Sequence, residues 1–120
     1  MTHPRPDGEQ EFDIPDEALV VRFGNGTRAQ YGSNCHRTLA TPRWGFSAFS
    51  VRAAVGLSAE EIHDHPPPPP WNEWTTTTGL QLREAGLQSR KTGNDRLHYS
   101  ILCPDGVTDH VWDILREIFR

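Results

Sequence analysis

The stretch Trp44–Val51, WGFSAFSV, places the tightest constraint on the fold of this chain. If it is a β-strand, side chains alternate between its two faces, which puts Trp44 and Phe46 on one face and Phe49 on the other. Because both faces carry apolar bulk, the strand belongs in the middle of a sheet rather than at a solvated edge. A serine on it, such as Ser47, is then held inside and needs a partner or a ligand.

Two other apolar runs each carry one conspicuous polar residue, Arg22 in Leu19–Phe23 and His98 in Leu97–Cys103. Their alternation also predicts strands, and we expect the three strands to place Arg22, Ser47 and His98 around one cleft. Burying an unpaired guanidinium costs several kcal/mol, so an ion pair with a distant carboxylate, or an end-of-strand position in water, is the structural alternative for Arg22. For His98 the alternative is a satisfied core histidine.

The remaining pattern mixes short helices with strands and predicts an α+β domain with a small, strongly bent sheet and short flanking helices. We expect a single domain over residues 12–120, preceded by a disordered acidic arm over residues 1–11. The expected elements are an irregular or weakly helical segment 27–41, a helix opened by the capping box Ser58–Glu61 and closed by Pro66, a strand 71–78, a helix 79–85, an extended segment 87–90, and a last helix capped by Thr108 with an apolar stripe of Val111, Ile114, Leu115 and Ile118.

The segment Gly24–Ala29, GNGTRA, fits the G-x-G-x-x-A pattern of a dinucleotide-binding turn. A Rossmann unit also needs a helix that opens here and an acidic residue about 20 positions later. Gly32 is expected to interrupt such a helix, and the following stretch contains no carboxylate. We therefore interpret the segment as an ordinary turn, in which glycines and Asn25 tolerate positive φ.

Charge is distributed unevenly along the chain. Residues 1–21 hold six carboxylates against one arginine, whereas no Asp or Glu occurs between Ala18 and Ala59. Guanidinium groups grip phosphate oxygens in pairs, so an arginine-only stretch favours an anionic ligand such as a pyrophosphate or a nucleic-acid backbone. Scattered surface arginines are the alternative. The arginines in this stretch are Arg22, Arg28, Arg37, Arg43 and Arg52.

Five successive prolines, Pro66–Pro70, predict a stiff extended connector. The neighbouring His63-Asp64-His65 lacks a third placed ligand, so no metal site is expected. Two cysteines and the lack of an export-type N-terminal segment favour reduced thiols and a cytoplasmic protein, and no run approaches a membrane span.

The first strand LVVRFG, the strand WGFSAFS and the late segment LHYSILCP together resemble a family of small bacterial toxins. This family has an ADP-ribosyltransferase-like fold and includes a cytoactive type VI secretion effector and members of toxin–antitoxin pairs. The resemblance implies an NAD-dependent transferase that modifies a macromolecule and is held by a cognate antitoxin or immunity protein. By the same resemblance, Arg22 holds phosphate or ribose, Ser47 with Trp44 and Phe49 supports the nicotinamide ribose and ring, and His98 positions or activates the acceptor.

The chain departs from the family at its last strand, where His98-Tyr99-Ser100 stands in place of the expected glutamate. Glu73 or Glu84 then has to supply that carboxylate, or the transfer chemistry is altered. Two other hypotheses remain open. One is a ribonuclease or RNA-binding toxin in which His98 and His36 transfer protons beside Arg22 and Arg83. The other is a non-catalytic interaction module that binds through its proline segment or its C-terminal helix.

Overall fold

The computed structural model describes residues 11–42 and 45–120. Residues 1–10 of the predicted arm over residues 1–11 and the predicted cofactor contact Trp44 therefore lie outside the described residues, whereas Glu11 is described and buried. The α+β class is confirmed by five strands and four helices in this order: β1 Leu19–Phe23, α1 Arg28–Ala40, β2 Ala48–Ala54, α2 Ala59–Asp64, β3 Trp74–Thr78, α3 Gly79–Glu84, β4 Ser89–Lys91, β5 His98–Leu102 and α4 Asp109–Ile118.

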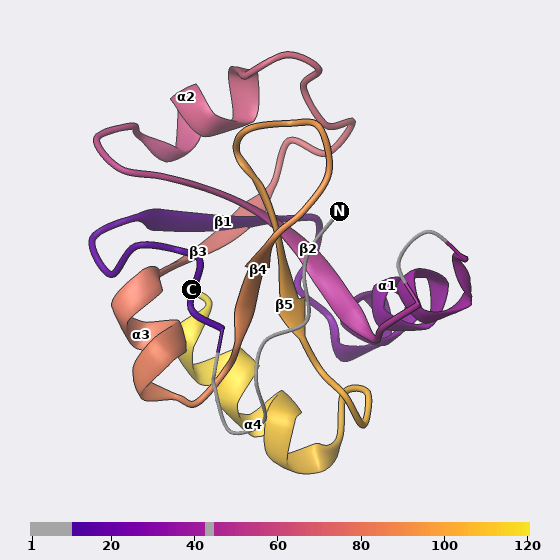
Figure 1. Ribbon diagram of the computed structural model, residues 1–120. Helices are drawn as coiled ribbons and strands as arrows, with labels where there is room; N and C mark the ends of the chain where they lie inside the picture. Colours follow the sequence, from indigo (N-terminus) through magenta and orange to yellow (C-terminus); the bar gives the residue numbers. More distant parts are fainter. Residues whose placement is uncertain (1–10, 43–44) are drawn as a thin grey trace.

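The five strands form one antiparallel sheet in the order β3-β1-β2-β5-β4 (Figure 1). The prediction that the aromatic stretch supplies the central strand is confirmed, although β2 begins at Ala48 and continues to Ala54. The earlier residues turn instead, because Gly45 has a φ of +67° and its N–H donates to the carbonyl of Thr41. Strand alternation then directs Phe49 into the core.

Two apolar clusters lie on the two faces of the sheet. The larger cluster includes Phe49 of β2, Tyr31 of α1 and Leu115 of α4, with the rings of Tyr31 and Phe49 in edge contact at 4.8 Å. The smaller cluster joins Val21 and Leu97 to Ile62 of α2. Figure 1 shows α2 on one side of the sheet and α3 with α4 on the other. The predicted docking role of the last helix is confirmed, since Leu115 is fully buried.

Helix α1 corrects the expectation of an irregular or weakly helical segment. Thr27 caps it by accepting from the N–H of Gln30, and the helix continues through Gly32. Its buried residues Tyr31, Asn34 and Cys35 have helical spacing, but Asn34 breaks the apolar pattern by which an amphipathic helix is recognised. The Rossmann unit remains excluded for another reason: β1 and β2, which flank α1, are antiparallel, whereas that unit requires parallel strands.

Segments near the chain ends cover both edges of the sheet. On the outer edge of β4, the N–H of Ser89 donates to the carbonyl of Glu11, and Glu11 itself is buried and pairs with Arg90 at 2.6 Å. On the outer edge of β3, Thr76 and Arg120 exchange two backbone hydrogen bonds, 2.8 and 2.9 Å long. Within the described ranges, no helix has both the length and the apolar character needed to cross a membrane.

The two helical glycines provide a matched test of this packing. A methyl group added at Gly79 would overlap the carbonyl oxygen of Pro15, whereas one added at Gly32 meets no atom within 4 Å. We expect Gly79→Ala to lower the free energy of unfolding by about 1–3 kcal/mol through overpacking. Gly32→Ala should raise it by about 0.5–1 kcal/mol, because alanine loses less backbone entropy on folding. Urea unfolding of both variants checks the pair, and equal effects would contradict the described position of α3.

Candidate functional site

The candidate site forms where β1 and β2 separate. Their pairing runs from Leu19 to Val21, and beyond it α1 lies beside the exposed edge of β2. There, the side chains of Asn34 and Arg22 hydrogen-bond to the backbone of β2 in place of a neighbouring strand. The N–H of Ser50 donates to Oδ1 of Asn34 at 2.9 Å, and its carbonyl accepts from Nη1 of Arg22 at 2.8 Å. Nη1 of Arg22 also donates to Oδ1 of Asn34 at 2.9 Å, which closes a three-membered polar cluster.

Arg22 is a buried cation with no acidic partner among the described residues. Its side chain is 8% exposed, and its guanidinium lies 5.1 Å from the centre of the Tyr31 ring and 5.7 Å from that of Phe49. No ion pair joins it to a carboxylate of the described residues, and its buried Nε has no hydrogen-bond partner there. Burial lowers the pKa of Arg22, and the positive charge of Arg37 lowers it further. The ion pair considered as the structural alternative for Arg22 is therefore not formed with any described carboxylate, and the local charge favours an anion.

A pocket of about 510 Å³ opens beside this cluster. We call it the arginine pocket. Within the described part of the chain, no Asp or Glu lines it. Charged, aromatic and polar side chains contribute to its wall, among them Arg22, Phe23, Asn34, Arg37, Ser50, Arg52, Trp71, His98 and Ser100.

The five arginines of the acid-free stretch have different environments. Arg28 pairs with Asp109 at 2.8 Å and Arg52 pairs with Asp95 at 3.0 Å, so their charges are compensated. Arg43 lies outside the described residues. Arg37 is exposed and forms no ion pair with any described residue. Arg22 and Arg37 therefore supply the uncompensated positive charge of the arginine pocket.

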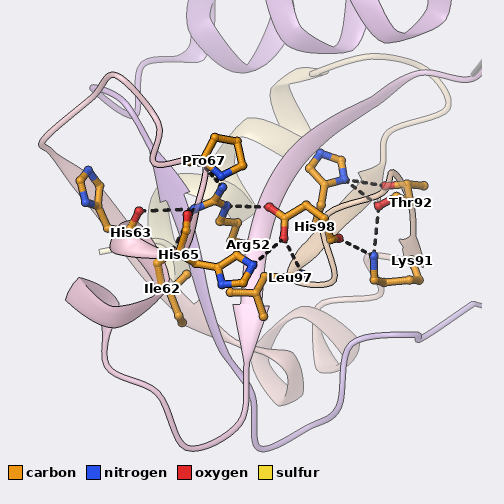
Figure 2. Close-up of polar contacts among 10 residues, drawn as sticks. Arg52, Ile62, His63, His65, Pro67, Lys91, Thr92, Leu97 and His98 are labelled. Atoms are coloured by element: carbon orange, nitrogen blue, oxygen red, sulfur yellow. Dashed lines mark hydrogen bonds and ion pairs between the residues drawn. The ribbon is translucent and has the colours of Figure 1, made fainter.

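His98 lines the same pocket from β5. Figure 2 shows its ring in contact with Thr92. Its Nδ1 lies 3.0 Å from the carbonyl oxygen of Thr92 and 2.9 Å from Oγ1 of that residue. A carbonyl only accepts, so Nδ1 carries the proton and Nε2 keeps its lone pair. Burial lowers the pKa of His98 below its ordinary value of 6.5, which leaves the ring neutral at pH 7. His98 therefore has the tautomer of a proton acceptor.

The arginine pocket brings together two of the three residues expected to share a cleft. Arg22 and His98 line it, and Ser50 occupies the place expected for Ser47. Ser47 lies before β2, where its carbonyl accepts from the N–H of Cys103 at 2.9 Å. The pKa of the Cys35 thiol is lowered chiefly by a hydrogen bond with Cys103 and further by one with the Ser47 hydroxyl. Ser47 therefore contacts the core side of α1.

Other residues named from the sequence also lie away from the pocket. Phe49, expected beside the nicotinamide, is fully buried in the larger apolar cluster. Glu73 and Glu84 are exposed, and neither lines the arginine pocket. Of the proposed nuclease residues, His36 does not line the pocket, and Arg83 pairs with Asp16 at 2.9 Å.

Sequence reasoning missed Asn34, Trp71 and the function of Arg52. The guanidinium of Arg52 donates to the carbonyls of Ile62 and His65 at 3.1 and 2.9 Å and to that of Pro67 (Figure 2). Asp95, its ion-pair partner, also lies 3.5 Å from Nε2 of His65. In the sequence, Arg52 is recognisable as an arginine within an apolar strand. The same is true of Arg22, so the pattern does not show that the two have different functions. Arg52 fastens the segment after α2 to the sheet.

Two histidines should have pKa values on opposite sides of 6.5, the ordinary pKa of histidine. The pKa of His98 is lowered by burial, while the pKa of His63 is raised by its hydrogen bond to Asp64. NMR titration of the imidazole groups should therefore place His98 below 6.5 and His63 above it. Because the unfolded chain binds a proton at His98 more readily than the folded one, the stability that His98 contributes is lost as the pH falls below about 6.5.

The variants His98→Gln and His63→Gln assign the two titrations. Each should remove one of the two displaced midpoints and leave the other in place. A reversed order of the two midpoints would contradict the hydrogen bonds described for these rings.

Comparison of the chain with known proteins finds no relative. Neither protein-family models, nor curated proteins, nor solved structures match the chain. The function of the protein is therefore proposed from the charge and volume of the arginine pocket and from the tautomer of His98.

Proposed function

We propose that this protein binds a phosphate-bearing nucleotide in the arginine pocket. The observation that carries the proposal is the pair of uncompensated cations, Arg22 and Arg37, in a pocket that no described carboxylate lines. A buried guanidinium without an acid is costly, and a bound phosphate offsets that cost through charge-assisted hydrogen bonds. Nη1 of Arg22 is used by Asn34 and Ser50, so the fold positions the guanidinium before a ligand arrives.

The dimensions of the pocket support a nucleotide rather than free phosphate. Its volume of about 510 Å³ lies within the range of about 300–1,000 Å³ that is usual for pockets holding organic ligands. Arg22 contacts Asn34 of α1 and Arg37 belongs to that helix, while the aromatic side chains Phe23 and Trp71 supply apolar wall. A ligand with a charged group and a flat apolar group fits this distribution.

The resemblance to toxins with an ADP-ribosyltransferase-like fold narrows the ligand to NAD and the reaction to ADP-ribosyl transfer. NAD would serve as substrate and supply the ADP-ribose, which is released when the bond to nicotinamide breaks. In this proposal Arg22 and Arg37 hold the phosphates. His98 accepts the proton of the attacking acceptor group at Nε2, so the acceptor gains a bond to the ribose while nicotinamide leaves with the electrons of the broken bond. A cognate antitoxin or immunity protein belongs to the same proposal.

Ribonuclease activity is the second candidate, favoured by one observation. The pocket combines a neutral histidine with arginines and has no described carboxylate in its wall, which suits cleavage of a phosphodiester. His98 would take the proton from a ribose 2′-hydroxyl, whose oxygen then attacks the adjacent phosphorus. The 5′-oxygen leaves and is protonated by water, which yields a 2′,3′-cyclic phosphate.

Binding of ADP and of NAD tests the nucleotide proposal by calorimetry. Arg37→Ala should weaken both ligands about 10- to 100-fold, because it removes a charge-assisted contact. Arg37 suits this test because its exposed side chain forms no ion pair with the described residues. Arg116→Ala is the matched control, since Arg116 pairs with Asp113 on the surface of α4 and does not line the pocket. Equal affinities for the two variants would refute the proposal.

Two labelled substrates separate the transferase from the nuclease. The protein is incubated with cell extract and NAD labelled in its adenylate phosphate, and in parallel with end-labelled RNA. Transfer moves the label to protein or nucleic acid, whereas the nuclease shortens the RNA without moving the label. In either case His98→Gln should lower the rate by about 100- to 10,000-fold, the usual contribution of a general base. A rate unchanged by this substitution would exclude His98 as the base.

A further inference from the structure

The two aromatic side chains of the arginine pocket have different surroundings. Phe23 makes edge contacts with the rings of His63 and Trp74, at centroid distances of 5.6 and 6.2 Å. Trp71 lines the same pocket but has 47% of its surface exposed. Within the described part of the chain its ring forms no ring contact and no cation–π contact. Trp71 therefore presents a free aromatic surface at the pocket.

The backbone that carries Trp71 is firmly held despite that exposure. Nε2 of His63 lies 2.9 Å from the carbonyl oxygen of Trp71 and donates to it. Nδ1 of His63 is fixed in turn by Asp64, also at 2.9 Å. On the chain before Trp71, the ring of each of the five prolines fixes its own φ. The segment is not the uniformly extended connector expected from the sequence, because the Pro66–Pro67 peptide bond is cis and the chain bends there. The platform is thus ordered without help from a ligand.

Arg52 adds a second anchor to the same segment. It binds the carbonyls of His65 and Pro67, and its charge is compensated by Asp95 (Figure 2). These bonds come from β2, the strand that also carries Ser50 of the polar cluster. The segment before Trp71 and the guanidinium of Arg22 are therefore both held by one central strand. A binding surface ordered in advance loses less entropy when the ligand arrives.

We propose that Trp71 is the nucleobase platform of the arginine pocket, so that the base stacks on its ring while the phosphates contact Arg22 and Arg37. This inference rests on the proposed nucleotide binding and specifies how the ligand lies. It also replaces Phe49, one of the two stacking residues expected from the sequence, since Phe49 is buried in the core. The other, Trp44, lies outside the described residues. Every base has a π face, so the platform selects nucleotides over simple phosphates and discriminates weakly among bases.

Matched ligands isolate the contribution of the base. ADP and inorganic pyrophosphate both carry two linked phosphates, but only ADP has a base. Trp71→Ala should weaken ADP binding by roughly 5- to 100-fold, the usual effect of removing a stacking side chain, and leave pyrophosphate binding within twofold. Trp71→Phe should bind ADP nearly as well as the wild type, whereas Trp71→Leu, which keeps apolar bulk without a ring, should resemble Trp71→Ala. Arg37→Ala should weaken both ligands.

The outcomes distinguish this inference from the proposal on which it rests. If the wild type binds ADP and Trp71→Ala binds it equally well, the platform is wrong and nucleotide binding stands. If Trp71→Ala weakens ADP and pyrophosphate alike, the residue acts through the shape of the pocket, and the platform is also wrong. If the wild type binds neither ligand, the proposed function fails and the inference with it. Thermal unfolding of each variant verifies that it is folded under the conditions of the assay.

Discussion

The polar cluster of Arg22, Asn34 and Ser50 is the interaction on which the rest of the structure depends. Backbone N–H and C=O groups in a protein interior need hydrogen-bond partners. Here β2 extends beyond its pairing with β1, so part of its backbone lacks a neighbouring strand on that side. The amide oxygen of Asn34 supplies the missing acceptor, and the guanidinium of Arg22 supplies the missing donor. Because α1 then replaces a strand at this edge, the sheet opens beside it, and the pocket lies in that opening.

The same cluster gives Arg22 two functions that are difficult to separate. One nitrogen of the guanidinium completes the hydrogen bonding of β2, while the positive charge itself has no compensating acid among the described residues. The aromatic rings of Tyr31 and Phe49 offset part of the cost of burial through their π faces. Loss of Arg22 would therefore alter the fold and the ligand site together. Arg37, which is exposed on the same pocket, separates binding from folding more cleanly.

Local patterns in the sequence predicted much of the sheet and little of the site. The alternation around Phe49 and the caps at Ser58, Thr78 and Thr108 were sufficient to place a central strand and three helices. Helix α1 was missed because a buried asparagine occupies the position where an apolar residue would reveal the core face.

The site depends on partners that are distant in sequence. Arg22 and Arg52 both stand in buried strands, but the carboxylate of Asp95 compensates only Arg52. Ser47 and Ser50 lie three residues apart in one apolar run, and only Ser50 lines the pocket. No spacing rule could identify which serine or which arginine remains available to a ligand.

Both outer strands meet other segments of the same chain, Glu11 against β4 and Arg120 against β3. A foreign peptide that sought to extend the sheet would first have to displace one of these segments, so the fold resists recruitment into larger β-assemblies.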